Sequence, residues 1–116
     1  MPVTLPAELA AAILREVLVG LVRRDGPVLT SHQFAVFLTC YTVPDDHTVR
    51  GLARRLDVSK SVITRSLDKL AALGLAERRP DPQDRRSVLV AHTVAGAALM
   101  REITGAAVLS ARGWQG

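Results

Sequence analysis

The sequence has too little of several residue types to support some common classes of protein. Its single cysteine, Cys40, has no partner within the chain for a disulfide, which fits a reducing compartment. The glycines are scattered rather than grouped as a phosphate-binding loop, and His32, His47 and His92 lack the spacing of metal ligands. Because the cysteine has no evident base either, the sequence predicts that the protein is not an enzyme and needs no cofactor.

Long apolar runs are also scarce. The run at residues 17–22 has about a third of the length that a membrane-spanning helix needs. The first basic residue is Arg15, so the N-terminus lacks the positively charged start of a signal peptide. We therefore expect no membrane partner and a cytoplasmic location.

The cysteine lies in a segment that favours burial over chemistry. Residues 34–41 are mostly apolar, and no basic residue near Cys40 in the sequence is placed to stabilise a thiolate. A small buried side chain is the favoured interpretation, and a redox-sensing thiol is the alternative.

What the sequence does have is the composition of a folded domain with a basic middle. At 116 residues, 48% of them apolar and 22% charged, it is predicted to form one domain over residues 1–116. Residues 48–90 contain ten Lys or Arg and five Asp or Glu, whereas the rest of the chain contains five and six. This pattern indicates a face that binds a polyanion, and a solvated basic surface without a partner is the alternative.

The N-terminal helix is predicted over residues 4–23, with Thr4 as its cap. It carries two apolar stripes, Leu9-Ile13-Val17-Leu21 and Leu14-Leu18-Val22. A helix that is apolar on two sides needs a packing partner on each side. In so short a chain, a second copy of the chain is the simplest source of that partner. We interpret it as a dimerisation helix of a homodimer.

The segment 30–92 has the pattern of a winged helix-turn-helix. A capping box, Thr30 with Gln33, opens a helix whose aromatic stripe is interpreted as core. Thr48 caps a short helix, and a tight turn leads to a further amphipathic helix over about residues 59–73. Two short helices joined in this way are typical of a helix-turn-helix.

A β-hairpin, the wing, is predicted at residues 76–91. Its strands are expected at 75–79 and 87–91, with the turn at 80–83 and two arginines at the tip. Thr93 then caps a last helix over residues 93–111. The predicted fold is mainly α with a small β-hairpin (α+β), a winged helix-turn-helix flanked by N- and C-terminal dimerisation helices.

The helix at 59–73 and the wing tip both present side chains suited to DNA. An apolar stripe faces the core and leaves hydroxyls, which let the backbone approach, and cations that reach guanine or phosphate. An arginine at the wing tip is thin enough to enter a minor groove, and the Asp84 carboxylate is a candidate for holding it extended. The candidate DNA-binding residues are Ser59, Lys60, Ser61, Thr64, Arg65, Lys69, Asp84, Arg85 and Arg86.

Residues 48–93 resemble the MarR family of bacterial transcriptional regulators. The most specific part is the run Arg79-Pro-Asp-Pro-Gln-Asp-Arg-Arg-Ser87, which is similar to the wing of that family. The resemblance implies a dimeric winged-helix regulator, usually a repressor, released from a pseudo-palindromic operator by a small aromatic ligand or by oxidation. It also implies that Ser61, Thr64 and Arg65 read bases, with Arg86 at the wing tip.

One departure concerns the C-terminus. The family usually has a further helix after the one expected from Thr93, and the sequence ends at Gly116, so the resemblance implies a short variant. The sequence therefore predicts a dimeric repressor that binds double-stranded DNA, with helix 59–73 in the major groove and the wing in the minor groove. The alternative is a winged-helix protein-interaction module, such as an antirepressor that pairs with another regulator.

Overall fold

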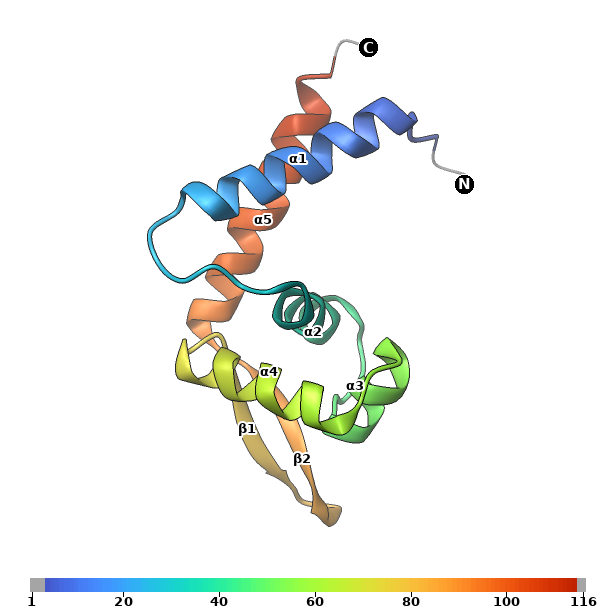
Figure 1. Cartoon of the computed structure of the whole chain (residues 1–116), viewed down its shortest axis with the longest axis vertical. Helices are drawn as coiled ribbons and strands as arrows, with labels where there is room; N and C mark the ends of the chain where they lie inside the picture. Colours follow the sequence, from blue (N-terminus) through green and yellow to red (C-terminus); the bar gives the residue numbers. More distant parts are fainter. Residues whose placement is uncertain (1–3, 115–116) are drawn as a thin grey trace. The chain divides into compact units, whose positions relative to one another are not determined.

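The computed structural model describes residues 4–114, which form five helices and one two-stranded hairpin (Figure 1). Their order is α1 (Ala7–Arg23), α2 (Ser31–Thr42), α3 (Val49–Leu56), α4 (Lys60–Ala72), β1 (Ala76–Asp81), β2 (Asp84–His92) and α5 (Val94–Arg112). This is the α+β winged helix-turn-helix that the sequence predicts.

The described residues divide into two compact units. The core unit is Leu29–Leu99, and the terminal unit consists of the described residues up to Val28 and from Met100 onward. The boundary at the C-terminal side falls within α5. The expectation of one domain over residues 1–116 stays a prediction.

Side-chain caps begin the helices of the core unit as predicted. At α2, Thr30 Oγ1 accepts a hydrogen bond from the Gln33 N–H at 3.2 Å, and Gln33 Oε1 accepts one from the Thr30 N–H at 3.0 Å. At α3, Thr48 Oγ1 accepts from the Gly51 N–H at 3.0 Å. These bonds satisfy backbone donors that the first turn of a helix leaves unpaired, so the capping residues fix where each helix starts.

The turn between α3 and α4 depends on one left-handed residue. Asp57, the C-cap of α3, has φ 54° and ψ 49°, a conformation that Asp and Asn tolerate better than most residues. Two residues later Ser59 caps α4, because its Oγ accepts a hydrogen bond from the Val62 N–H at 3.2 Å. The predicted helix-turn-helix is therefore confirmed.

The core of the molecule lies in the core unit. Phe37 from α2, Leu52 from α3 and the α4 stripe that includes Ile63 and Leu70 are fully buried. The remaining buried apolar residues of this unit are Val36, Cys40, Ala53, Leu67, Leu75, Ala76 and Leu99. Parts of four helices and the start of the wing thus share one apolar interior, which holds α4 with its opposite face outward.

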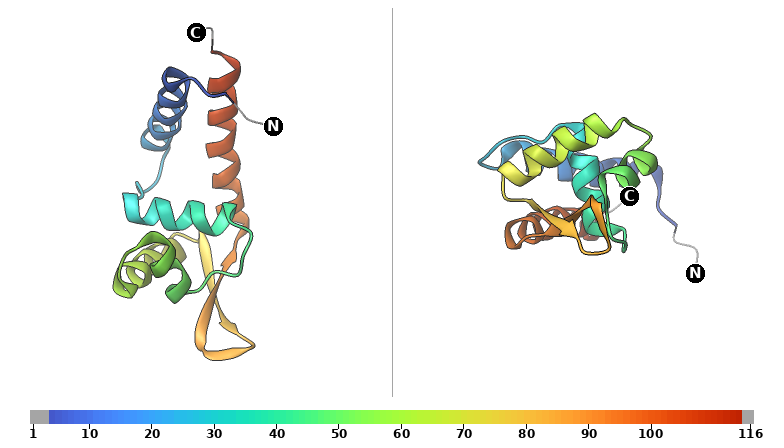
Figure 2. Two further views of the ribbon diagram at one scale, coloured as in Figure 1. Left: turned by 90° about the vertical axis from the view of Figure 1, so that its right-hand side faces the viewer. Right: turned by 90° about the horizontal axis from the view of Figure 1, so that it is seen from below.

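The hairpin is longer than predicted, and its turn is tighter. β1 and β2 pair antiparallel from Ala76 opposite His92 to Pro80 opposite Val88, with an irregularity before Asp81 faces Asp84. Only residues 82–83 connect the strands, so the expectation of a turn over 80–83 and a second strand starting at Ser87 was wrong. The hairpin extends beyond α2, α3 and α4 (Figure 2).

The chain before α3 adds a third segment to the wing. Thr48 forms an isolated antiparallel bridge with Leu89, and the Val90 N–H donates to the His47 carbonyl at 3.0 Å. These contacts attach the outer side of β2 to the start of α3.

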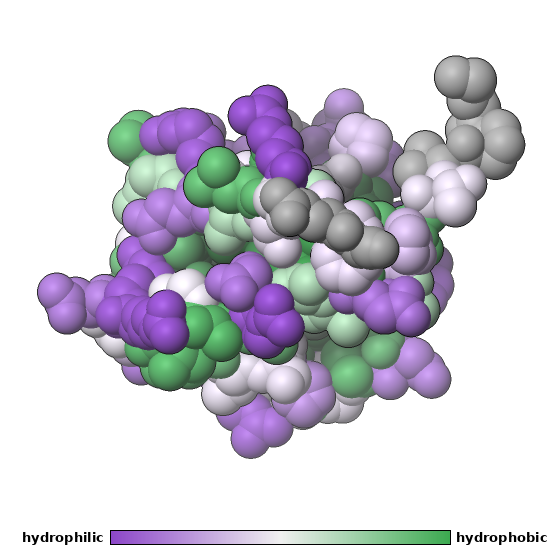
Figure 3. All heavy atoms as spheres, turned by 90° about the horizontal axis from the view of Figure 1, so that it is seen from above, coloured by the Kyte–Doolittle hydropathy of each residue, from purple (hydrophilic) through white to green (hydrophobic). Residues whose placement is uncertain are grey.

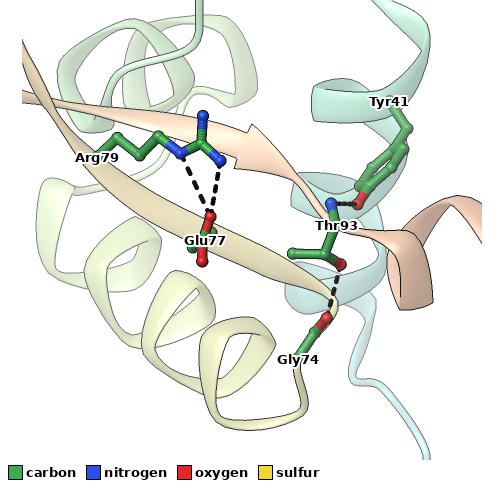
Figure 4. Close-up of polar contacts among 5 residues, drawn as sticks. All are labelled: Tyr41, Gly74, Glu77, Arg79 and Thr93. Atoms are coloured by element: carbon green, nitrogen blue, oxygen red, sulfur yellow. Dashed lines mark hydrogen bonds and ion pairs between the residues drawn. The ribbon is translucent and has the colours of Figure 1, made fainter.

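A hydrogen-bonded junction joins α2, the end of α4 and the start of α5 (Figure 4). The Tyr41 hydroxyl donates to the Leu75 carbonyl at 2.8 Å and accepts from the Thr93 N–H at 3.0 Å. Thr93 Oγ1 donates to the Gly74 carbonyl at 2.6 Å and accepts from the Gly96 N–H, which confirms Thr93 as the cap of α5. A Cβ at position 96 would lie 1.8 Å from the Tyr41 oxygen and 2.3 Å from the Leu75 carbonyl oxygen, so this site requires glycine.

The terminal unit contains α1 and the rest of α5. α1 begins after Pro6 and has no side-chain cap, so the prediction that Thr4 caps it was wrong. Arg24 and Glu102 form an ion pair at 3.2 Å. The stripe Leu14-Leu18-Val22 is exposed, and Figure 3, which looks onto α1 and the end of α5, shows hydrophobic side chains at the surface between hydrophilic ones.

α5 alone among the described helices is long and apolar enough, by length and composition, to cross a membrane. Helices that pack inside soluble proteins have the same properties, and the first turns of α5 belong to the core unit through the Thr93 junction. The expectation of no membrane partner stays a prediction.

Candidate nucleic-acid interface

The outward face of α4 collects most of the predicted DNA-binding residues. Ile63, Ser66, Leu67 and Leu70 are buried, and the opposite side of the helix is exposed. The exposed candidates on this helix are Lys60, Ser61, Thr64, Arg65 and Lys69. The helix therefore presents three cations and two hydroxyls on its outward side, a set that can donate hydrogen bonds to base edges and phosphates.

The two serines at the start of α4 have different surroundings. Ser59 Oγ is held by the cap bond to the Val62 N–H and lies 3.4 Å from the Ser61 oxygen. The N-terminal turn of the helix also carries free backbone N–H groups and a partial positive charge, which favour a phosphate. Ser59 thus shapes the end of the helix, while Ser61 lies on its exposed surface.

The wing arginines lie on a strand rather than in the turn. Arg85 and Arg86 are the second and third residues of β2, and both are exposed. They fall in the irregular part of the ladder, because Pro80 faces Val88 and Asp81 faces Asp84, so residues 85–87 have no partner on β1. Both remain within a few residues of the turn at Pro82 and Gln83.

Asp84 contacts the backbone of Arg86 in this structure, and its predicted role of holding an arginine side chain extended stays a prediction. Its carboxylate accepts hydrogen bonds from the Arg86 backbone N–H at 3.0 Å and from Ser87 Oγ at 3.1 Å, and no ion pair joins it to the Arg86 guanidinium within residues 4–114. These two bonds lower the pKa of the Asp84 carboxyl, and the positive charge of Arg50 adds to the effect. Asp84 therefore orders the backbone at the start of β2 and stays ionised at neutral pH.

A contact that the sequence did not reveal joins the wing to α4. Arg78, in β1, donates from its guanidinium to the Thr64 carbonyl at 3.1 Å and to the Asp68 carboxylate. Asp68 and Thr64 are one helical turn apart on the outward side of α4. The helix and the wing are thus tied together on the same side that bears the candidate residues.

Cys40, His47 and His92 make contacts within the fold of the core unit. Burial raises the pKa of the Cys40 thiol to about 11, so the thiol is protonated at neutral pH. The His92 ring stacks on Tyr41 at 4.0 Å between centroids, and His47 is buried with its Nε2 2.9 Å from the Val43 carbonyl oxygen. Within residues 4–114, no group of three or more His, Cys, Asp or Glu side chains could hold a metal ion.

Two known proteins are similar to this chain in sequence. The Multiple antibiotic resistance protein MarR of Escherichia coli K12 is 43% identical over 51 residues, which cover 44% of this chain and 35% of that protein. The chain thus spans about a third of the length of that relative. An uncharacterised protein of Mycobacterium tuberculosis, Rv2011c, is 35% identical over 96 residues, which cover 79% of this chain and 67% of that protein.

A solved structure is similar over a longer stretch. A mutant MarR from E. coli in complex with operator DNA matches with a TM-score of 0.69 and 28% identity, and the match covers 90% of this chain and 72% of that one. The profile of the MarR family matches residues 29–87, from the end of the loop before α2 into β2. The resemblance seen in the sequence is confirmed, and proteins of this family are DNA-binding regulators rather than enzymes. The chain, with its exposed α4 and its arginine-bearing wing, belongs to the MarR family of transcriptional regulators.

Proposed function

We propose that this protein is a dimeric repressor that binds a pseudo-palindromic operator in double-stranded DNA. In each copy, α4 lies in the major groove and the wing in the minor groove. The observation that carries the proposal is that the exposed cations of α4 and the exposed arginines of β2 belong to one compact unit and are tied through Arg78. The similarity to a relative solved with operator DNA supports it.

The proposed roles on α4 follow from the reach of each side chain. Ser61 and Thr64 are short, so they allow the helix backbone to approach the bases and can donate or accept one hydrogen bond each. Arg65 has two parallel donors that match guanine O6 and N7. Lys60 and Lys69 bind phosphates, which adds affinity without sequence information.

The wing contributes shape-dependent contacts. A narrow minor groove concentrates negative potential, and a guanidinium is thin enough to enter it. Arg85 and Arg86 are proposed to make these contacts, and Asp84 to hold the backbone at Arg86 through its hydrogen bond to the Arg86 N–H.

Dimerisation sets the operator. Two copies related by a two-fold axis present two α4 helices, so half-sites about 34 Å apart, one turn of the duplex, should be bound together. Such a regulator acts where the chromosome lies, in the cytoplasm. A small aromatic effector, implied by the resemblance alone, stays a prediction.

The proposal is tested by selecting bound sequences from a random DNA pool and then titrating the selected operator at several salt concentrations. We expect Arg65→Ala and Arg86→Ala each to weaken binding about tenfold and Lys60→Ala to lower the salt slope by about one. Arg101→Ala is the matched control, because Arg101 is an exposed arginine of the terminal unit, and it should leave both quantities unchanged.

If the three substitutions change neither affinity nor salt slope while the protein still binds DNA, the assigned face is wrong. A chain that light scattering finds as a monomer and that binds no DNA from the pool would favour the protein-interaction alternative.

A further inference from the structure

We propose that Arg78 is a positioning residue that fixes the wing against α4, so that helix and wing reach DNA in a single relative geometry. The inference rests on the proposed function, because it concerns how the two DNA-contacting elements are held. Arg78 itself is not assigned a contact with DNA.

The contacts of Arg78 are placed where they control the wing. One terminal nitrogen of its guanidinium donates both to the Thr64 carbonyl, at 3.1 Å, and to the Asp68 carboxylate. Thr64 lies next to Arg65 on the exposed side of α4, so the bond attaches the wing at the part of the helix proposed to read bases. A backbone carbonyl is a fixed point, and the carboxylate one turn away prevents the guanidinium from rotating about it.

The position of Arg78 within the hairpin lets its contact control where the arginines of β2 lie. In the β ladder Arg78 faces Val90, whereas Asp81 faces Asp84 next to the arginines of β2. At the usual rise of a strand, the three residues from Arg78 to Asp81 span about 10 Å. A small rotation of the hairpin at Arg78 therefore displaces Arg85 and Arg86 by a larger distance.

The exposure of the pair argues against a role in folding. The Asp68 side chain is 58% exposed and that of Arg78 is 37% exposed. Exposed ion pairs contribute little to the stability of a folded protein. The contact of Arg78 with Thr64 and Asp68 therefore adds little to stability, but it selects one orientation of the wing, which suits a positioning role.

The sign of one substitution separates positioning from simple electrostatics. Asp68→Ala removes a negative charge from the face that is proposed to meet DNA, so electrostatics alone predicts equal or tighter binding. Positioning predicts weaker binding, by about fivefold per half-site, because the wing is released. The salt slope should not change, since no phosphate contact is lost.

Arg78→Met completes the test, because it keeps the length of the side chain and removes its hydrogen bonds. We expect a similar loss for this variant and no further loss when it is combined with Asp68→Ala, since both substitutions break one contact. Discrimination between the selected operator and random duplex should fall by the same factor, because non-specific binding does not need a fixed wing. A salt slope that drops by about one in Arg78→Met would overturn the proposal, since it would mean that Arg78 binds phosphate directly.

Glu77→Ala is the matched control. Glu77 is an exposed carboxylate of the same hairpin, but its partner, Arg79, lies two residues away on the same strand, at 3.0 Å (Figure 4). We expect equal or tighter operator binding for this variant. Thermal unfolding should show that Asp68→Ala, Arg78→Met, their combination and Glu77→Ala are all folded.

The outcomes distinguish this inference from the proposed function. If the unmodified protein and the Arg65→Ala variant behave as the proposed function requires while Asp68→Ala binds as well as the unmodified protein, only the positioning role fails. If Arg65→Ala leaves binding unchanged, the docking face itself is wrong, and the positioning role falls with it.

Discussion

The core unit contains a group of fully buried large apolar side chains, whereas the terminal unit leaves most of its own at the surface. Phe37, Leu52 and Ile63 of the core unit are fully buried, while Leu14 and Leu18 of α1 are 64% and 51% exposed. Within the terminal unit, Ala12 and Ile103 are the buried apolar residues among those described. The two units therefore have different sources of stability.

Under the proposed function, this difference indicates which unit a second copy of the chain would cover. Interactions within one chain account for the fold of the core unit. An exposed apolar stripe along a helix gains free energy only when it is covered, at roughly 25 cal/mol for each Å² removed from water. We expect folding of the core unit to be insensitive to association and the terminal unit to depend on it. Four experiments, each with its own control variant, test this contrast.

The largest effect should come from the core unit. Phe37→Ala removes a ring that is completely buried, so the free energy of unfolding should fall by about 3 to 5 kcal/mol in urea titrations. Val94→Ala is the control in the same unit, because Val94 is 87% exposed, and its effect should stay below about 0.5 kcal/mol. Equal effects for the two variants would mean that the core unit is not packed as described.

The next effect concerns association rather than folding. Replacing both Leu14 and Leu18 by Lys puts charges on the exposed stripe of α1 and should weaken the proposed dimer by about 3 kcal/mol. Light scattering at micromolar concentration should then report the mass of one chain instead of two. Glu16→Lys, an exposed position outside the stripe, should leave the mass at two chains.

One helix allows the same substitution to be compared in both units. Gly96→Ala places a Cβ against Tyr41 and the Leu75 carbonyl and should lower the free energy of unfolding by about 2 kcal/mol. Gly105, further along α5 in the terminal unit, has no atom within 4 Å of a built Cβ. Gly105→Ala should therefore stabilise the helix by up to about 1 kcal/mol. Thermal and urea unfolding measure whether each variant is more or less stable than the unmodified protein. A loss of stability in Gly105→Ala as large as that in Gly96→Ala would contradict the difference between the two units.

The smallest effect compares the helix starts of the two units. Thr30→Ala removes the capping box of α2 and should cost about 1 kcal/mol in unfolding experiments. Thr4→Ala should cost nothing measurable, because α1 begins after Pro6 without a side-chain cap. Equal losses would show that Thr4 is a cap after all.

Local signals explain which parts of the fold could be predicted from the sequence. The caps at Thr30, Thr48, Ser59 and Thr93 are short-range hydrogen bonds, and each was placed correctly together with the helix that follows it. Thr4 failed for a local reason as well, since Pro6 takes the position before the helix and no polar side chain is needed there.

Long-range contacts explain what could not be predicted. The strands of the wing extend further than the alternation of residues suggested, because pairing across the ladder, with support from His47 and Thr48, holds residues that look like turn formers. The contact of Arg78 with Thr64 and Asp68 joins residues ten or more positions apart, and no spacing rule indicates such a pair. The outward residues of α4 were predictable because helical periodicity alone separates them from the core.

Having Arg85 and Arg86 on consecutive positions of β2 has a consequence for any groove that the wing enters. The two walls of a duplex groove are the two sugar-phosphate backbones, one from each strand. Under the proposed docking, both guanidinium groups enter the same groove, so its width decides how closely they approach the phosphates of the two walls. Base pairs that the protein does not touch can still change the width of the minor groove. Operators that differ only at such base pairs should then be bound with different affinities.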